Sequence, residues 1–375
     1  MKYRVFPKVN QKSSALGFGC MRLPVQDTEG HPIDRPEAIR MIRHAIDEGV
    51  TYIDTAFGYH NEESEVVVGL ALQDGYREKV NLATKLPLWK VEVAEDMERL
   101  LDIQLGRLQT DHVDFYLLHA CNRKSFDRVR ELGALEFLQE MKKKGKIRYA
   151  GFSFHDDKEA FYHIVDSFDW DFCQVQMNVL DEFHQATMEG VRYASSKGIG
   201  IVVMEPLRGG ALTVRMPEEI RQIYRKTSYD RTEAEWAFRW VIDKPEFITV
   251  LSGMSTYEQL GENLRIFDSC EEGCLSEEEI KVLTDIRSAY EARIRVGCTG
   301  CEYCMAGCPM SIRIPEIFRP YDNAAMFDDL PRFYERYRKD VGGNECIKCG
   351  ACESICPQKI EIRKWLDTIA QEALS

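Results

Sequence analysis

Short apolar runs alternate with amphipathic stretches over the first two thirds of the chain. The apolar runs are predicted to be strands at 16–19, 51–56, 80–85, 112–119, 146–153, 172–178, 200–206 and 247–253. The stretches between and after them have helical spacing at 36–48, 62–72, 91–105, 127–144, 159–166, 185–197 and 255–267, with a longer helical segment at 216–243. The first twenty residues are expected to form a short hairpin that leads into the first strand. Eight strands alternating with helices predict an α/β fold of the (β/α)8 TIM barrel type, with an open doubly wound sheet as the alternative.

Composition and charge narrow the class of protein. Among 375 residues, 62 are acidic and 49 are basic, and the net charge of −13 disfavours nucleic acid and anionic membranes as partners. No apolar run reaches the roughly 18 residues that would predict a membrane span, and the first residues lack the apolar core of a signal peptide. We therefore expect a cytoplasmic protein. No G-x-G-x-x-G follows an early strand, which counts against a Rossmann fold.

Cysteines gather in two runs of identical spacing near the end of the chain. Each run reads C-x2-C-x2-C-x3-C-P, the first at Cys298, Cys301, Cys304 and Cys308 and the second at Cys346, Cys349, Cys352 and Cys356. This spacing is typical of ferredoxins with two [4Fe-4S] clusters, in which the last cysteine of each run ligates the other cluster. One cluster is thus assigned to Cys298, Cys301, Cys304 and Cys356, and the other to Cys346, Cys349, Cys352 and Cys308. Zinc sites and disulfides are the alternatives; zinc does not need the added cysteine and proline, and a reducing compartment opposes disulfides.

The region between the two runs, 309–345, is aromatic and charged and is expected to be helical. It resembles the helical ferredoxin modules of larger redox enzymes. We place the barrel at 1–268, a linker at 269–297, and a small, mainly helical ferredoxin-like iron–sulfur domain at 298–375. The linker is predicted to hold a helix that is capped by Ser276 and runs to about residue 294.

Polar side chains end several of the predicted strands. Asp54, Lys85 and His119 each close an apolar strand, and Tyr59 lies in the loop after Asp54. Each alone would be an ordinary structural residue, but the carboxyl ends of barrel strands meet at one rim, where active sites form. The segments IDTAFGY, ATK and YLLH resemble, in order and register, the Asp-Tyr-Lys-His tetrad of the aldo-keto reductases. The resemblance covers roughly residues 1–268, and GFS at 151–153, FCQVQMN at 172–178 and SGMSTYEQLGEN at 252–263 strengthen it.

General chemistry agrees with the roles that the resemblance implies. A carbonyl that accepts a hydride becomes an alkoxide and needs a proton, but a tyrosine hydroxyl with a pKa of about 10 is a weak acid at neutral pH. We expect Tyr59 to be the acid/base and Lys85 to lower its pKa. Asp54 is expected to anchor Lys85 through a charge pair, and His119 to orient the substrate oxygen. The substrate is then a small carbonyl or alcohol.

The resemblance also implies a nicotinamide dinucleotide, with Ser153 and Gln174 holding its carboxamide. The loop 206–210 is expected to pass near the pyrophosphate, and residues after the last strand to surround the adenosine. The full set of cofactor contacts implied by the resemblance is Gly19, Met21, Asp54, Ser153, Gln174, Met204, Pro206, Leu207, Gly209, Gly253, Ser255, Gln259, Glu262 and Asn263.

The chain departs from the family pattern in three respects. Met204 stands where many members stack a tyrosine on the nicotinamide, and Phe154 stands where an asparagine often follows the carboxamide serine. Gly253 and Gln259 stand where a lysine and an arginine often clamp the 2′-phosphate. We expect NADP, with NAD as the alternative and Arg208 and Arg265 as candidate replacements for the clamp. Trp89, which follows Lys85, is either a wall of the substrate pocket or part of the core.

A nicotinamide transfers two electrons as a hydride, whereas each cluster transfers one. Three hypotheses about how the barrel and the clusters function together remain. The first is a reductase whose clusters exchange electrons with a redox partner such as a flavoprotein or a ferredoxin. The second is a carbonyl reductase with structural or redox-sensing clusters. The third is a non-catalytic subunit that senses nicotinamide, which the complete tetrad disfavours.

Overall fold

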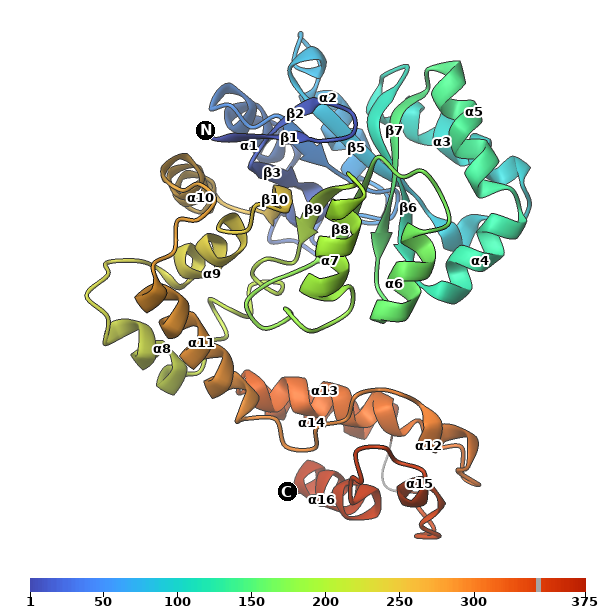
Figure 1. Cartoon of the computed structure of the whole chain (residues 1–375), viewed down its shortest axis with the longest axis vertical. Coiled ribbons are helices and arrows are strands. Elements are labelled where there is room, and N and C mark those ends of the chain that lie inside the picture. The colour runs from blue at the N-terminus through green and yellow to red at the C-terminus, as the bar shows by residue number, and fades with distance from the viewer. Residues whose placement is uncertain (342–344) are drawn as a thin grey trace. The chain divides into compact units, whose positions relative to one another are not determined.

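The computed structural model describes residues 1–341 and 345–375. Its central feature is a closed barrel of eight parallel strands, which confirms the predicted fold (Figure 1). In chain order the strands are β3 (Leu16–Gly19), β4 (Tyr52–Asp54), β5 (Asn81–Leu86), β6 (Val113–Cys121), β7 (Ile147–Phe154), β8 (Phe172–Gln176), β9 (Gly200–Met204) and β10 (Phe247–Gly253). Sequential strands are neighbours, and β10 closes the barrel by pairing with both β9 and β3. Strands buried on both faces explain the continuous apolar runs of the sequence.

The predicted hairpin is formed by β1 (Tyr3–Phe6) and β2 (Gln11–Ser14), which pair antiparallel. Its Phe6 is fully buried and packs at 4.8 Å from the Phe115 ring and 6.4 Å from the Tyr52 ring. A Cβ at Gly200 would lie 2.2 Å from the Phe6 ring, so a glycine is needed there. Phe6 of the hairpin therefore joins a buried aromatic cluster with Tyr52, Phe115 and Phe172 of the barrel strands.

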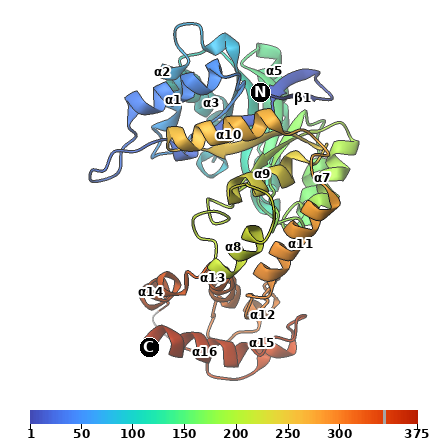
Figure 2. The ribbon, with the colours of Figure 1, turned by 90° about the vertical axis from the view of Figure 1, so that its left-hand side faces the viewer.

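Helices surround the strands (Figure 1). They are α1 (Arg35–Asp47), α2 (Ser64–Ala71), α3 (Glu95–Leu108), α4 (Arg123–Glu131), α5 (Ala134–Lys144), α6 (Lys158–Val165), α7 (Thr187–Ser196), α9 (Glu233–Ile242) and α10 (Tyr257–Ser269). The last of them, α10, lies beside α1 (Figure 2). The single helix predicted at 127–144 is wrong, because Gly133, at a φ of +88°, separates α4 from α5. An Asn122–Ser125 capping box also starts α4 earlier than predicted.

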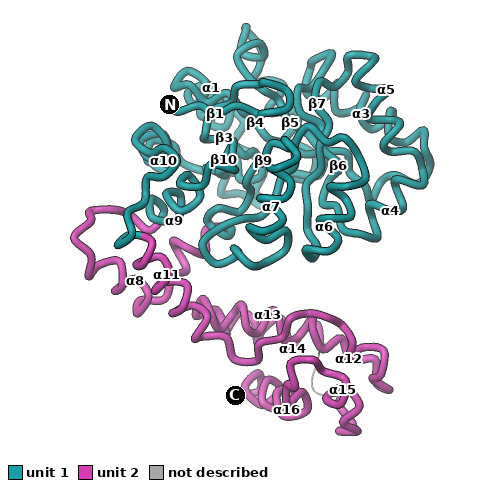
Figure 3. The backbone as a smooth tube through the Cα atoms, viewed as in Figure 1, with its two compact units in different colours: residues 1–209, 234–279 teal, residues 210–233, 280–375 magenta. Residues whose placement is uncertain are grey.

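Two compact units divide the chain (Figure 3). One comprises residues 1–209 and 234–279, and the other comprises 210–233 and 280–375. The helical segment predicted at 216–243 is therefore not continuous. It consists of α8 (Glu218–Arg225), which belongs to the second unit, and α9, which belongs to the first. The domain limits at 268 and 297 differ from this division and stay a prediction.

The linker helix is α11 (Glu277–Glu291), which crosses from one unit into the other. Ser276 Oγ accepts a hydrogen bond from Glu279 N at 3.2 Å, and the Glu279 carboxylate accepts one from Ser276 N at 2.7 Å. This reciprocal pair is a capping box, which satisfies two backbone donors at the helix start. The helix thus begins where the sequence predicted.

The cysteine-rich part of the second unit is mainly helical. Its helices are α12 (Tyr303–Ala306), α13 (Ile314–Met326), α14 (Leu330–Asp340), α15 (Ala351–Ser354) and α16 (Ile362–Leu374). Their core contains Phe318, Tyr321, Leu366 and Ile369. The helical prediction for 309–345 is confirmed by α13 and α14, and residues 342–344 lie outside the described residues. None of the helices in the described ranges is both long and apolar enough to cross a membrane.

Candidate active site and cluster cavities

Strand register brings the four predicted catalytic residues together at one rim of the barrel. Lys85 Nζ donates to Asp54 Oδ2 at 2.7 Å and to the Thr55 carbonyl oxygen at 2.8 Å. It also lies 3.3 Å from Tyr59 Oη. The Tyr59 and His119 rings meet edge to face, with centroids 6.1 Å apart. Lys85 therefore links the carboxylate and the phenol, and the histidine ring is a neighbour of the phenol ring.

Burial controls the charges of this group. Lys85 is fully buried, and although burial acts to lower its pKa, the charges of Asp54 and Tyr59 outweigh that effect and raise it. Burial raises the pKa of Tyr59 more than Lys85 lowers it. The expectation that Lys85 brings the tyrosine pKa down therefore describes only one of two opposing effects. Tyr59 stays a protonated phenol at neutral pH, ready to donate a proton.

His119 is held neutral. Burial, followed by the nearby charge of Lys85, lowers its pKa to about 3. Its Nδ1 is buried and has no hydrogen-bond partner among the described residues. His119 is on β6 next to Ala120, whose φ of +52° interrupts the regular pairing of β6 with β7. Within the tetrad, the imidazole of His119 thus has one buried nitrogen without a hydrogen-bond partner among the described residues.

The backbone after Tyr59 forms a turn that the sequence did not signal. His60, Asn61 and Glu62 have φ values of +49°, +54° and +72°, a left-handed conformation that costs about 1–2 kcal/mol per non-glycine residue. His60 Nε2 accepts a hydrogen bond from Leu23 N at 3.1 Å. The Glu62 carboxylate pairs with Lys90 at 2.7 Å and Arg107 at 2.5 Å. These contacts hold the strained turn and thereby fix the position of Tyr59.

Trp89 lies at the entrance to this group. It is in the turn η3 (Leu88–Lys90) after β5, and its side chain is 55% exposed. Its ring is 5.2 Å from the His119 ring, and a Cβ at Gly58 would touch it at 3.6 Å. The core alternative is thus wrong, because the indole stands in solvent next to the imidazole.

The residues assigned to the carboxamide are adjacent. Ser153 and Gln174 are register partners on β7 and β8. Gln174 Nε2 lies 3.4 Å from Met204 Sδ, while its buried Oε1 has no partner among the described residues. Ser153 Oγ accepts from Ala120 N at 2.7 Å and keeps its own hydroxyl proton free to donate. An unpaired acceptor beside a donor fits a primary carboxamide, which carries both groups.

The residues assigned to the other end of the cofactor lie around β10. Gly19 and Gly253 are register partners on β3 and β10. Ser255 N donates to Gln259 Oε1 at 2.8 Å, and Asn263 Nδ2 donates to Ser252 Oγ at 2.9 Å. Among the remaining assigned residues, Met21 is exposed, Pro206 is buried, Leu207 and Glu262 are half-buried, and Gly209 is exposed at a φ of +61°.

The two candidate replacements for the phosphate clamp are both engaged elsewhere. Arg265 Nη2 pairs with Glu235 at 2.9 Å. Arg208 Nη1 lies 3.7 Å from Asp181 Oδ1. A third arginine, Arg22, follows β3 in the turn η1 (Cys20–Arg22).

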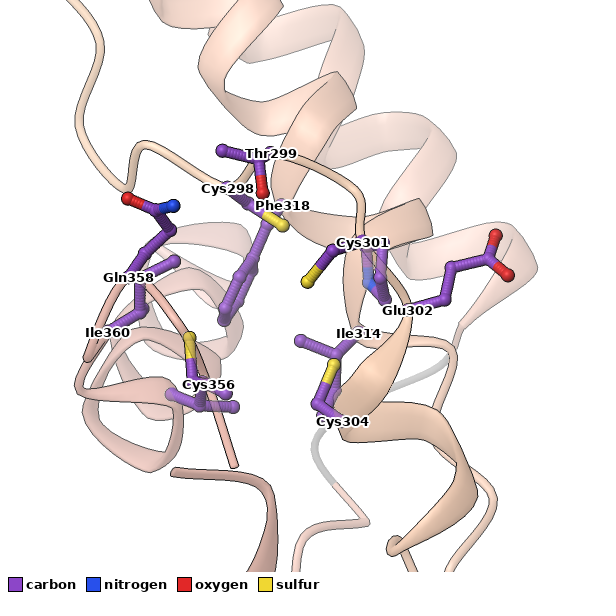
Figure 4. A pocket seen from close by; sticks show the side chains of 12 residues that line it. Cys298, Thr299, Cys301, Glu302, Cys304, Ile314, Phe318, Cys356, Gln358 and Ile360 are labelled. Atoms are coloured by element: carbon purple, nitrogen blue, oxygen red, sulfur yellow. The ribbon is translucent and has the colours of Figure 1, made fainter. Parts of the chain in front are cut away.

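The eight clustered cysteines line two cavities in the second unit. Cys298, Cys301, Cys304 and Cys356 surround the first, and their sulfur atoms point into a common space (Figure 4). Cys308, Cys346, Cys349 and Cys352 line the second. The structure thus groups the thiols as the crossed assignment expects, with the last cysteine of each run facing the other run's cavity.

The spacing of these thiols distinguishes between a single metal ion and a multi-atom cluster as the group they bind. In the described ranges 1–341 and 345–375, no three His, Cys, Asp or Glu side chains are placed to bind one metal ion. Zinc requires its sulfurs at about 2.3 Å from one point, so thiols around a wider space fit a multi-atom cluster better. Ile312 N donates to Cys308 Sγ and Lys348 N to Cys346 Sγ, each at 3.4 Å. Such bonds stabilise thiolates that ligate iron.

The two cysteine loops repeat one backbone conformation. Gly300 and Lys348 have φ values of +76° and +62°, and Glu302 and Gly350 have φ values of +63° and +78°. Gly300 and Lys348 both lie two residues after the first cysteine of their runs, and Glu302 and Gly350 both lie one residue after the second cysteine. A short helix follows in both runs, α12 and α15. Left-handed residues between successive cysteines turn the chain sharply, which brings three sulfurs of one run to the same side.

Comparison with known proteins gives two matches to family models. The aldo/keto reductase family matches residues 15–288, and a 4Fe-4S dicluster domain matches residues 297–361. The chain is 26% identical over 300 residues to the uncharacterised oxidoreductase YqkF of Bacillus subtilis, covering 72% of this chain and 91% of that protein. It is 25% identical over 288 residues to L-galactose dehydrogenase of Arabidopsis thaliana, covering 70% and 87%. Among solved structures, the holo form of the aldo-keto reductase AKR11C1 of Bacillus halodurans is similar, with a TM-score of 0.64 and 26% identity, covering 76% and 96%.

Proposed function

Because the chain belongs to the aldo/keto reductase family and carries a 4Fe-4S dicluster domain, we propose that it is a nicotinamide-dependent oxidoreductase with two clusters that exchange electrons with a partner. The barrel reduces a small carbonyl or oxidises the matching alcohol. The observation that carries this proposal is the contact of buried Lys85 with both Asp54 and Tyr59 at a rim that also holds an unpartnered carboxamide site.

Tyr59 is the acid in this reaction. A nicotinamide held at this rim would supply the hydride for the carbonyl carbon, and the oxyanion would then need one proton to become an alcohol. Tyr59 Oη gives up that proton, and Lys85 at 3.3 Å stabilises the phenolate that is left. Asp54 keeps Lys85 placed and protonated through their 2.7 Å contact. Alcohol oxidation runs these roles in reverse, with the phenolate as base.

His119 orients the carbonyl. A pKa of about 3 keeps the imidazole neutral at physiological pH, so it acts as a hydrogen-bond donor through its one N–H and carries no charge. A neutral donor holds the carbonyl oxygen without competing with Tyr59 for proton transfer. The exposed face of Trp89, 5.2 Å from the imidazole, forms an apolar wall for the substrate's carbon skeleton.

Ser153 and Gln174 hold the nicotinamide carboxamide, and Met204 packs against the ring. The free acceptor of Gln174 takes the amide N–H, and the Ser153 hydroxyl donates to the amide oxygen. Met204 Sδ lies within 3.4 Å of Gln174, so the thioether is positioned beside the carboxamide site. Gly19, Met21, Asp54, Pro206, Leu207, Gly209, Gly253, Ser255, Gln259, Glu262 and Asn263 complete the nucleotide site. NADP is the proposed cofactor.

Two [4Fe-4S] clusters are ligated by crossed sets of cysteines. Cys298, Cys301, Cys304 and Cys356 hold one, and Cys346, Cys349, Cys352 and Cys308 hold the other. Each cluster carries one electron, whereas a hydride carries two. The proposed partner is therefore a flavoprotein, which can divide an electron pair, or a ferredoxin that takes electrons singly.

An anaerobic titration tests the proposal. Purified full-length protein is titrated with NADPH and then NADH, while the nicotinamide band and the broad iron–sulfur absorbance are both followed. Bleaching of the clusters on adding a catalytic flavoprotein, together with nucleotide oxidation, is the expected result. Clusters that stay oxidised with every partner, while a simple aldehyde consumes nucleotide, would contradict the electron-exchange part and leave a carbonyl reductase. Failure to bind either nucleotide would contradict the whole proposal.

A further inference from the structure

Two cysteines that take no part in the cluster cavities lie in the short loop after α10. Cys270 follows the last residue of that helix, and Cys274 lies four residues later, before α11 begins. Both are free thiols, and their side chains are hydrogen-bonded to each other. Between them Gly273 adopts a φ of +67°, which turns the chain. The loop therefore contains a pair of adjacent thiols.

The residue after α9, Asp243, holds this loop in place. The Gly273 N–H donates to the Asp243 carbonyl oxygen at 3.0 Å, and the Leu275 N–H donates to Asp243 Oδ1 at 3.0 Å. These two bonds lie on either side of Cys274 in the chain. Cys274 Sγ also lies 3.8 Å from the Arg239 carbonyl oxygen on α9. The sulfur of Cys274 is thus fixed from both sides next to Cys270.

The surroundings of Cys270 favour a thiolate. The hydrogen bond from Cys274 has the largest effect and lowers the pKa of Cys270 to about 6, although burial opposes it. The Ser269 hydroxyl, whose oxygen lies 3.6 Å from Cys270 Sγ, and the Arg239 guanidinium act in the same direction. The charge of Glu235 opposes them. The same hydrogen bond raises the pKa of Cys274, so the shared proton stays there.

Access to the pair is restricted to small molecules. Cys270 is 1% exposed, whereas Cys274 is half-buried and the residues between them, 271–273, are exposed. A small oxidant can approach through this open loop, but a bulky one would meet Cys274 first. A thiolate that lies beside a second, protonated thiol is the arrangement found in redox-active cysteine pairs.

We propose that Cys270 and Cys274 are a redox-active pair that hydrogen peroxide converts into a disulfide. The Cys270 thiolate attacks one peroxide oxygen, the O–O bond breaks, and the hydroxide that leaves takes a proton from solvent to become water. Cys270 is then a sulfenic acid. Cys274 attacks its sulfur, the S–O bond breaks, and the leaving hydroxide takes the Cys274 proton as a second water. The two thiols lose two electrons, which the peroxide gains. This modification is independent of the proposed function.

Peptide mass spectrometry of the full-length, cluster-loaded protein tests the proposal. Trypsin releases residues 266–281 as one peptide, which contains both cysteines and none of the cluster cysteines. After brief peroxide treatment and alkylation in denaturant, this peptide should be lighter by two hydrogen atoms and carry no alkyl group. Dithiothreitol given before alkylation should restore both thiols. A 266–281 peptide that keeps two alkylatable thiols would overturn the inference.

Cys121 serves as the internal control in the same digest. Burial raises its pKa, and it lies on a different tryptic peptide. Its oxidation should be at least about tenfold slower than that of the pair, because the thiolate is the reacting species. Equal rates for Cys121 and the pair would mean general damage by peroxide and would also overturn the inference.

Single variants separate the roles of the two thiols. In Cys274→Ser the reaction should stop at the sulfenic acid of Cys270, which dimedone labels on the 266–281 peptide. Cys270→Ser should gain little label, because Cys274 keeps its proton. Equal labelling of the two variants would overturn the assignment of Cys270 as the attacking thiol. Cys121→Ser is the matched control and should form the disulfide as wild type does. Thermal unfolding checks that the variants are folded, and the wild-type measurement does not depend on them.

Discussion

Replacing Lys85 by methionine removes the cation that links the two acids of the tetrad. The side chain is fully buried, and its Nζ contacts Asp54 at 2.7 Å and Tyr59 at 3.3 Å. We expect the rate of carbonyl reduction to fall by roughly 10²- to 10⁴-fold, because the phenolate left by proton transfer is no longer stabilised. Nucleotide affinity should fall less than turnover, since Lys85 is not itself a proposed cofactor contact, although its partner Asp54 is.

The same substitution should destabilise the barrel in a pH-dependent way. It leaves Asp54 as an unpaired buried charge, which costs about 3–5 kcal/mol unless the carboxylate takes up a proton. Burial already raises the pKa of Asp54, and without Lys85 nothing opposes the shift. A folded-state pKa above the unfolded value of 3.8 means that the folded state binds the extra proton. Between those two values, stability therefore increases as the pH falls, by about 1.4 kcal/mol per unit.

Urea unfolding followed by tryptophan fluorescence at several pH values measures this effect. The comparison is between Lys85→Met and the double variant Lys85→Met/Asp54→Asn, which has no carboxylate to protonate. Lys143→Met on the exposed end of α5 controls for the loss of a lysine. A pH-independent difference between the single and double variants would refute the reasoning, as would wild-type turnover in the single variant.

Four further outcomes follow from the site. Tyr59→Phe should lose carbonyl reduction, measured by stopped-flow rates, and keep nucleotide binding, measured by calorimetry. Turnover in this variant would contradict the role of Tyr59 as the acid. Because burial raises the pKa of Tyr59, alcohol oxidation should accelerate as the pH rises above neutrality while reduction does not, which a pH–rate profile in each direction checks. His119 is neutral above a pKa of about 3, so reduction should show no inflection near the usual histidine pKa of 6.5; an inflection that disappears in His119→Gln would contradict the neutral imidazole. Cys356→Ala should alter the same electron paramagnetic resonance signal as Cys298→Ala, and Cys308→Ala the same signal as Cys346→Ala; the opposite pairing would refute crossed ligation.

The local sequence pattern was sufficient to predict the order of the strands and to identify most of the candidate catalytic and cluster-ligating residues. Parallel barrel strands are buried on both faces, so each appears as an apolar run whose polar terminus marks the rim. The tetrad positions Asp54, Lys85 and His119 were visible for that reason. Cysteine spacing carried similar information, because C-x2-C-x2-C fixes three ligands within one loop. Helix limits were less certain. The break at Gly133 depends on a positive φ, which a helical apolar period does not reveal.

Tertiary structure decided the contacts between residues far apart in sequence. Gly253 lies beside Arg22 only because β10 closes the barrel against β3, and no local pattern contains that pairing. Burial likewise set the balance of charges at Tyr59, since desolvation depends on everything packed around a group. The sequence by itself therefore determined which chemical groups this protein has. Barrel closure and the packing of the second unit determined which of them meet, because contact and desolvation are properties of the folded chain.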